Sequence, residues 1–91
     1  MTVENLTPEL ARQLGLRRED RGVVVTNVDP SSMAARDGIR PGDLIVAIGT
    51  KPIESVADFR EATRGDALKN GVRVQVQREG VRRFVYLRSR G

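Results

Sequence analysis

The alternation of apolar and polar positions divides this chain into short strands and short helices. Residues 22–28 form a β-branched run and residues 43–48 a second apolar run, both typical of buried strands. Apolar and polar residues alternate over residues 72–76, and after a turn at 78–80 a last strand carries Phe84 and Tyr86 two positions apart, which predicts a closing hairpin. A weaker alternation over residues 1–6 predicts another short strand. Together these segments indicate a small, largely antiparallel sheet.

Helix-capping residues mark the starts of the helices between these strands. Thr7 caps a first short helix that ends at Gly15, and Ser31 or Ser32 caps a second of one to two turns. Ser55 caps the longest helix, expected over residues 56–64. The result is an α+β domain of five to six strands and two to three short helices. We expect its sheet to curl into a partly open antiparallel β-barrel or sandwich.

The composition requires an aliphatic core. Hydrophobic residues make up 38% of the 91 residues and aromatic residues only 3%. In the last strand, Phe84 and Tyr86 stand two positions apart and so share one face, which we expect to be the buried face. We therefore expect Val, Leu, Ile and Ala to pack around Phe59, Phe84 and Tyr86. A chain of this length predicts one domain, residues 1–91.

The positive charge is concentrated towards the end of the chain. The net charge is +4, from 16 basic and 12 acidic residues. Part of the excess lies at five late arginines: Arg78, Arg82, Arg83, Arg88 and Arg90. We interpret these as solvated, outward positions of a strand pair. The alternative is a patch for nucleic acid or another anionic surface, but too few aromatic residues are interleaved to favour a nucleic-acid partner.

The residues needed for most covalent catalysis are missing from the sequence. It contains no histidine and no cysteine, which rules out Ser-His-Asp and Cys-His triads and removes the commonest metal ligands. Its carboxylates have no metal-ligand spacing, and no glycine-rich loop has a nucleotide-binding pattern. We predict no catalytic residues, no metal and no cofactor. No apolar run approaches the ~18 residues of a membrane span, so we expect no membrane insertion.

The strongest motif lies between the two buried strands, and folding requirements explain each of its parts. Ala34 and Ala35 are small enough for a short helix to approach the sheet, and Gly38 permits the left-handed residue that ends this helix. Gly42 supplies a positive φ at the following turn, where Asp43 can accept backbone N–H bonds. The motif therefore predicts a scaffold, and the functional site is expected elsewhere.

This motif, Ala34-Ala35, Gly38-Ile39 and Pro41-Gly42-Asp43-Leu44-Ile45, resembles that of PDZ domains. The similarity is greatest to the second PDZ domain of bacterial HtrA/Deg (protease Do-like) serine proteases, and it covers nearly the whole chain. It implies a groove between an edge strand and the longest helix, into which a partner's C-terminal peptide adds as a further strand. The corresponding peptide-binding residues are Met1, Thr2, Val3, Glu4 and Asn5 of the edge strand, and Val56, Arg60 and Thr63 of the helix.

Within that groove, the resemblance gives Met1 and Val3 the role of lining the pocket for the last peptide side chain, and Val56, Arg60 and Thr63 face them. The family's carboxylate-binding loop precedes the edge strand. This chain begins at Met1, where that loop would be ending, and we expect the loop to be truncated.

The resemblance implies a binding module and not an enzyme. The expected function is capture of C-termini or unfolded segments for a bacterial periplasmic serine protease. The domain would be a fragment of this parent protease. We expect the parent to be a homo-oligomer and the isolated domain to be a monomer. Two alternatives remain. The domain could dock other domains of the protease oligomer in a structural or regulatory role, or it could come from another envelope protease or a secretion component.

Overall fold

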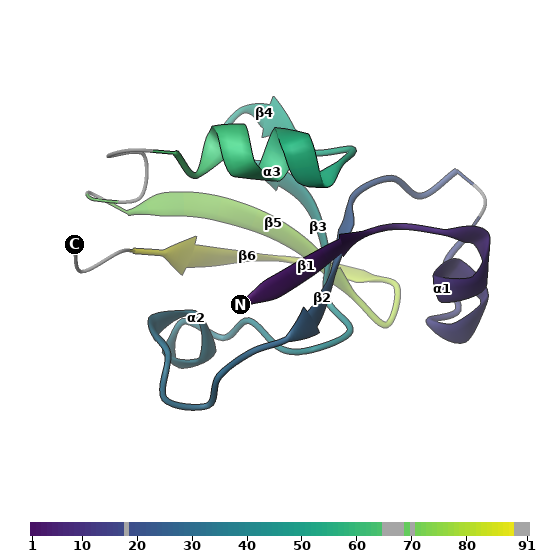
Figure 1. Ribbon diagram of the computed structural model, residues 1–91, viewed down its shortest axis with the longest axis horizontal. Helices are drawn as coiled ribbons and strands as arrows, with labels where there is room; N and C mark the ends of the chain where they lie inside the picture. Colours follow the sequence, from purple (N-terminus) through teal and green to yellow (C-terminus); the bar gives the residue numbers. More distant parts are fainter. Residues whose placement is uncertain (18, 65–68, 70, 89–91) are drawn as a thin grey trace.

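Six strands and three helices make up the part of the chain that the structure, a computed structural model, describes: residues 1–17, 19–64, 69 and 71–88 (Figure 1). The strands are β1 (Thr2–Asn5), β2 (Val23–Asn27), β3 (Leu44–Ile48), β4 (Lys51–Pro52), β5 (Val72–Arg78) and β6 (Val81–Leu87). The helices are α1 (Pro8–Gln13), α2 (Met33–Arg36) and α3 (Val56–Ala62). The predicted α+β class is confirmed.

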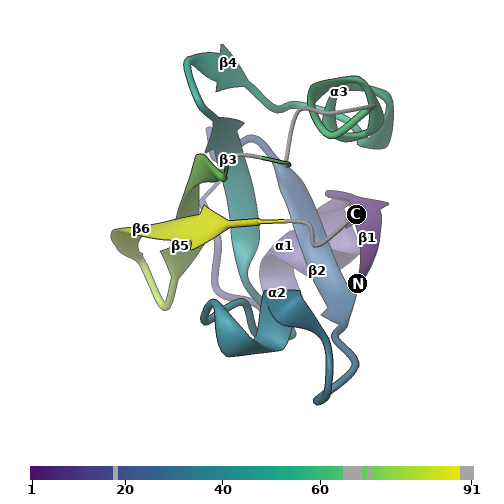
Figure 2. The same ribbon diagram turned by 90° about the vertical axis from the view of Figure 1, so that its left-hand side faces the viewer.

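The strands form one curled antiparallel sheet. Their order is β1-β2-β3-β5-β6, and β4 pairs with β3 off this path. Figures 1 and 2 show α3 and α2 on opposite sides of the curled sheet, whereas α1 lies apart from both at one end of the long axis. The sheet thus has two outer strands, β1 beside α3 and β6 at the far side.

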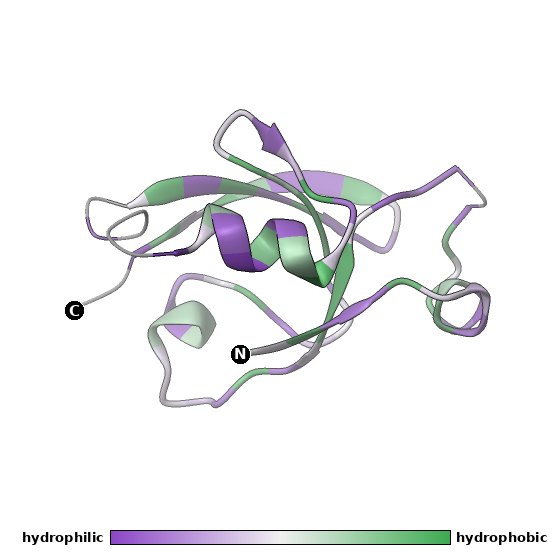
Figure 3. Ribbon diagram, turned by 45° about the horizontal axis from the view of Figure 1, so that its top comes forward, coloured by the Kyte–Doolittle hydropathy of each residue, from purple (hydrophilic) through white to green (hydrophobic). Residues whose placement is uncertain are grey.

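The core is aliphatic, as the composition requires. Val23, Val25 and Ile45 from β2 and β3 are fully buried, as are Val74 and Val76 from β5. Figure 3 shows the corresponding alternation of hydrophobic and hydrophilic residues along β5. Alternate residues of a strand face opposite sides of a sheet, so this pattern directs one face of β5 into the core.

Each helix begins at a side-chain cap that local sequence predicts. Thr7 Oγ1 accepts a hydrogen bond from Leu10 N at 3.1 Å, and Ser32 and Ser55 accept equivalent bonds at 3.2 Å. Ser32, and not Ser31, is therefore the cap of α2. The helix α3 ends at Ala62, earlier than expected, because Thr63 leaves the helical conformation with φ −107° and ψ 6°.

The last strand corrects one prediction. Phe84 and Tyr86 are 60% and 69% exposed, whereas Val85 and Leu87 are buried. The reason is the register of the hairpin. Glu79 and Gly80 both have positive φ, which gives a two-residue turn of the type that favours tight hairpins. This turn pairs Val74 with Val85, so β6 presents the residues between the aromatic ones to the core.

A second correction concerns Arg78, which is a half-buried partner of Asp43 and not a solvated charge. Its Nε and one Nη donate to the two carboxylate oxygens of Asp43 at 2.7 Å, and the same Nη donates to Gly38 O at 2.7 Å. Asp43 is 1% exposed, and it also accepts the predicted backbone bond from Arg40 N at 2.9 Å. Hydrogen bonding to Asp43 raises the pKa of Arg78.

The remaining late arginines follow the prediction as far as the structure describes them. Arg82, Arg83 and Arg88 are exposed, and Arg90 lies outside the described residues.

Candidate functional site

Among the strands that the structure describes, the outer strand β1 has one neighbour and one open edge. β1 pairs with β2, and α3 packs beside it. In an antiparallel ladder, alternate residues direct their N–H and C=O groups away from the neighbouring strand. Half of the backbone groups of β1 therefore face the space next to α3. Such an edge can accept one more strand.

A cavity of about 570 Å³ lies along this edge, between β1 and α3. Its lining consists of Val3, Glu4, Asn5, Thr7, Val56, Ala57 and Arg60. All of these except the two valines are exposed, so the cavity is open to water. We call this cavity the β1–α3 groove. It combines an apolar wall from Val3, Val56 and Ala57 with one carboxylate, on Glu4, and one guanidinium, on Arg60.

One long-range hydrogen bond joins the two walls of the groove. The Asn5 side-chain oxygen accepts from Val56 N at 2.8 Å, which satisfies an N–H group of the first turn of α3. The local cap acts beside it, since Ser55 Oγ accepts from Asp58 N and Asp58 Oδ2 accepts from Glu54 N at 3.0 Å. The groove is thus closed at the start of α3 by a contact between residues 51 positions apart.

The structure brings five of the eight proposed peptide-binding residues into this lining. They are Val3, Glu4 and Asn5 from β1, and Val56 and Arg60 from α3. Met1 and Thr2 lie outside the lining, towards the start of β1, and Thr63 lies outside it at the end of α3. Thr63 donates its hydroxyl to Phe59 O at 2.9 Å and Arg60 O at 3.3 Å, so this group is used within its own helix.

Two lining residues, Thr7 and Ala57, were not among the predicted site residues. Their signals in the sequence are those of a helix cap and a helix former, which do not indicate a groove.

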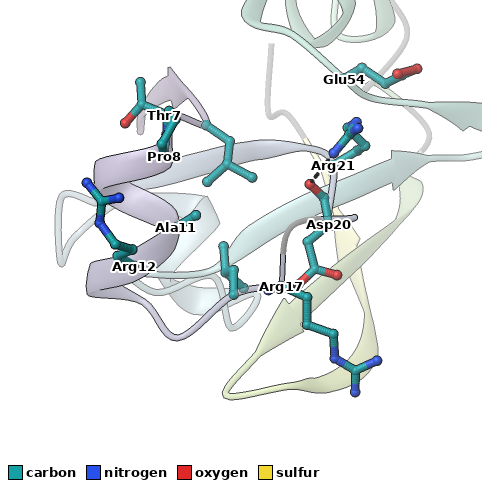
Figure 4. A pocket seen from close by; sticks show the side chains of 10 residues that line it. Thr7, Pro8, Ala11, Arg12, Arg17, Asp20, Arg21 and Glu54 are labelled. Atoms are coloured by element: carbon teal, nitrogen blue, oxygen red, sulfur yellow. Dashed lines mark hydrogen bonds between the residues drawn. The ribbon is translucent and has the colours of Figure 1, made fainter.

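A second cavity, of about 670 Å³, lies between α1 and the segment that leads to β2 (Figure 4). Its lining includes Leu6, Ala11 and Leu16, with Arg17 and Asp20 at its rim. The Asp20 carboxylate accepts from Arg17 N at 2.8 Å and from Gln77 Nε2 at 3.3 Å, so it holds the loop against β5. This cavity therefore indicates packing between α1 and the loop.

The described residues contain no metal site, and their buried polar side-chain atoms are all hydrogen-bonded. No helix in this part of the chain is long and apolar enough to cross a membrane.

Comparison with known proteins agrees with this geometry. The PDZ domain family matches residues 5–87, nearly the entire chain. This chain belongs to the PDZ domain family. The resemblance based on the motif between Ala34 and Ile45 is therefore confirmed.

Curated relatives of this PDZ domain are named as DegP-like proteases. A probable periplasmic serine endoprotease of this type from Chlamydia pneumoniae is 36% identical over 86 residues, which are 94% of this chain and 17% of the relative. A relative with the same name from Bartonella henselae is 44% identical over 69 residues, 72% of this chain and 14% of the relative. The chain thus spans about a sixth of the length of these relatives.

Solved structures of HtrA-type proteins share the fold. The HtrA-type protease AlgW, solved with a decapeptide, has a TM-score of 0.76 and 32% identity over 94% of this PDZ domain and 26% of its own chain. The HtrA3 PDZ domain, bound to the phage-derived ligand FGRWV, has a TM-score of 0.77 at 23% identity, covering 97% and 79% of the two chains. At that identity the second comparison supports the fold alone.

Proposed function

We propose that the β1–α3 groove binds the extended C-terminus or an unfolded segment of another protein by β-strand addition. The observation that carries this proposal is the open edge of β1, which faces α3 across an open groove. A peptide that pairs with β1 satisfies the outward backbone groups of the strand whatever its sequence, and side chains at alternate positions reach the groove.

The lining residues suggest a preference for apolar peptide side chains. Val3 and Val56 are half-buried and offer an aliphatic surface to the last side chain of the peptide. Arg60 faces the same space and would favour an acidic residue in the peptide, whereas Glu4 would favour a basic one. Met1 and Thr2, at the start of β1, would extend the backbone edge that pairs with the peptide beyond the groove. Thr63 lies at the end of α3, on the other side of the groove.

The relatives supply the context for this activity. AlgW was solved with a decapeptide, and the curated relatives are named periplasmic serine endoproteases. We infer that residues 1–91 form a single PDZ domain of such a protease in the bacterial periplasm. The domain would hold a chain that a catalytic domain elsewhere in an oligomeric parent cuts.

The test is a fluorescence-anisotropy titration of the 91-residue chain with a labelled peptide that ends in Val or Leu, as the free acid and as the amide. We expect saturation with a Kd in the micromolar range or weaker, about −8 kcal/mol or less favourable, since a single short strand is added. A loss of affinity on amidation would show that the terminal carboxylate contributes. If neither peptide saturates, the proposal is wrong.

A matched pair of variants locates the binding site. Val56→Asp places a charge on the apolar wall at the first position of α3, where an acidic residue suits the helix, so we expect the fold to remain and the affinity to fall at least about tenfold. Thr50→Asp makes a change of the same charge at an exposed turn outside the groove and is expected to bind as the unchanged chain does. Equal affinity of both variants would place binding elsewhere.

A further inference from the structure

A second candidate surface lies at the opposite side of the sheet, on the outer face of the β5–β6 hairpin. Tyr86 is paired with Arg73 and Phe84 with Gln75, and cross-strand partners share one face. The two aromatic side chains are 69% and 60% exposed, which is unusual for large hydrophobic residues. We define the hairpin face as Arg73, Gln75, Arg82, Phe84, Tyr86 and Arg88.

The face of the sheet that carries Phe84 and Tyr86 is buried where it crosses β2 and β3 and exposed to solvent on β6. One row of paired residues crosses it from Val24 and Leu44 through Gln77 to Arg82. The first two residues are 2% and 0% exposed, Gln77 is 9% exposed, and Arg82 is exposed. Asp20, in the segment between α1 and β2, accepts a hydrogen bond from Gln77, so polar cover from this segment extends as far as β5. On β6, the next strand of the sheet (Figure 2), the residues of this face are exposed to solvent.

The hairpin face is positively charged. The Arg73 guanidinium lies over the Phe84 ring, 4.7 Å from its centroid. A Cβ atom added at Gly71 would lie 3.5 Å from Arg88 Nε and 3.9 Å from Tyr86 Cδ1, so both side chains flank Gly71 at the end of the hairpin face. Within the described part of the chain, no ion pair joins the side chain of Arg73, Arg82 or Arg88 to a carboxylate, although the Asp37 carboxylate accepts from the backbone N of Arg88 at 3.3 Å.

We propose that the hairpin face docks an acidic surface of a partner protein, with aliphatic side chains against Phe84 and Tyr86 and carboxylates at the arginines. Exposed aromatic residues and arginines are the residue types that contribute most to protein interfaces. Arg73 already covers one side of the Phe84 ring, so that side cannot stack on a nucleic-acid base. A second copy of this chain would bring arginines against arginines, and like charges at an interface are unfavourable.

The proposal can be tested by NMR on the 91-residue chain. The probe is an acidic peptide of seven residues, the length of β6, in which Glu and Asp alternate with Leu and Val. Its C-terminus is amidated so that it lacks the terminal carboxylate of the free-acid groove peptide, and shifts at β1 and α3 would report any pairing with the groove. We expect amide shifts at Arg73, Gln75, Phe84 and Tyr86, and weaker binding as the salt concentration rises from about 0.05 M to about 0.5 M, because salt screens exposed charges.

Variants separate this face from the β1–α3 groove. The double variant Phe84→Ser and Tyr86→Ser changes exposed side chains only, so we expect a native spectrum, at least about a fivefold loss of acidic-peptide affinity, and unchanged binding of the free-acid groove peptide. A Lys-for-acid version of the probe is expected not to bind.

Several outcomes would overturn the proposal. They are shifts confined to β1 and α3, equal binding of the Lys-containing peptide, or unchanged affinity in the double variant. A single-stranded oligonucleotide that shifts the hairpin face at lower concentration than the acidic peptide would instead identify a nucleic-acid surface. Because the groove peptide is followed in the same samples, failure of this proposal is distinguishable from failure of the proposed function.

Discussion

The helices α2 and α3 pack against one curled sheet but are anchored in different ways. α2 has four residues, one of which, Ala34, is buried, and the turn that follows it is held by Asp43 and Arg78. α3 has seven residues, none of them buried, and it is joined to β1 by the Asn5 hydrogen bond and by a half-buried apolar face.

This difference distinguishes the scaffold around α2 from the proposed binding site beside α3. Around α2, charged hydrogen bonds between distant segments fix one arrangement of the turn, and every member of the group is paired. Around α3, the packing is partial and the space beside β1 stays open to water. Regions with few buried contacts are the ones that can adjust to a ligand. We therefore expect changes near α2 to affect mainly stability and changes near α3 to affect mainly binding.

The largest effect is expected from Arg78→Leu. This change leaves the carboxylate of Asp43, which is 1% exposed, without its cationic partner. Removal of one member of a buried ion pair costs about 3 kcal/mol or more. Urea denaturation should show this loss. Arg82→Leu, at an exposed position of the paired strand, is the control and should change stability by less than about 0.5 kcal/mol.

The double variant Asp43→Leu with Arg78→Leu tests why Arg78→Leu loses stability. If the unpaired charge dominates the loss, this variant should be more stable than Arg78→Leu alone, although Arg40 N still loses its acceptor. A double variant less stable than the single one would show that the pair itself, and not the orphaned charge, holds the turn.

A smaller effect, mainly on binding, is expected from Asn5→Ala. The variant removes the acceptor of Val56 N and frees the end of the groove, so peptide affinity should fall about fivefold, equivalent to about 1 kcal/mol. Asn5→Asp retains an acceptor next to the start of α3 and should bind like the unchanged chain. Calorimetric titration measures both. Equal affinity for all three proteins would mean that this bond does not position the groove.

Thr63→Val is expected to have a still smaller effect. The Thr63 hydroxyl donates to the carbonyls of Phe59 and Arg60. Both carbonyls lie in the last turn of α3, so the variant affects only the end of this helix. Its loss should lower stability by about 0.5 kcal/mol and change the peptide affinity by less than about twofold. A larger change in affinity, measured in the same anisotropy titration, would show that Thr63 contacts the peptide.

The smallest effect concerns pH and the loop before α2. Asp29 Oδ1 accepts from Ser31 N at 2.9 Å and Ser31 Oγ at 2.8 Å, and these bonds, the backbone bond first, lower the Asp29 pKa below its usual value of 3.8. A depressed carboxyl pKa stabilises the folded state above pH 3.8, and this contribution is lost as the pH falls below that value.

Asp29→Ala should accordingly be less stable than the unchanged chain at about pH 6, and the difference should diminish by about pH 2.5. Thermal unfolding of both proteins at the two pH values tests this. A difference that stays constant would show that ionisation of Asp29 does not contribute.

The sequence alone predicted the features that depend on neighbouring residues. Thr7 and Ser55 cap helices because their side chains reach N–H groups only three residues away. The buried strands follow from β-branched runs, and the positive φ of Gly38 and Gly42 agrees with the turns predicted there. The same motif identified the family, because it is made of residues that this fold requires in order.

The tertiary structure decided which distant residues meet. The partners Asn5 and Val56 are 51 residues apart and Asp43 and Arg78 are 35 apart, so no local pattern indicates either contact. The exposed position of Phe84 depends on the turn geometry at Glu79 and Gly80, since a shift of one residue would exchange the two faces of β6. Local chemistry thus determined the helices and strands of this PDZ domain. Pairing and register across the sheet decided the β1–α3 groove, the ion pair between Asp43 and Arg78, and the exposed position of Phe84 and Tyr86.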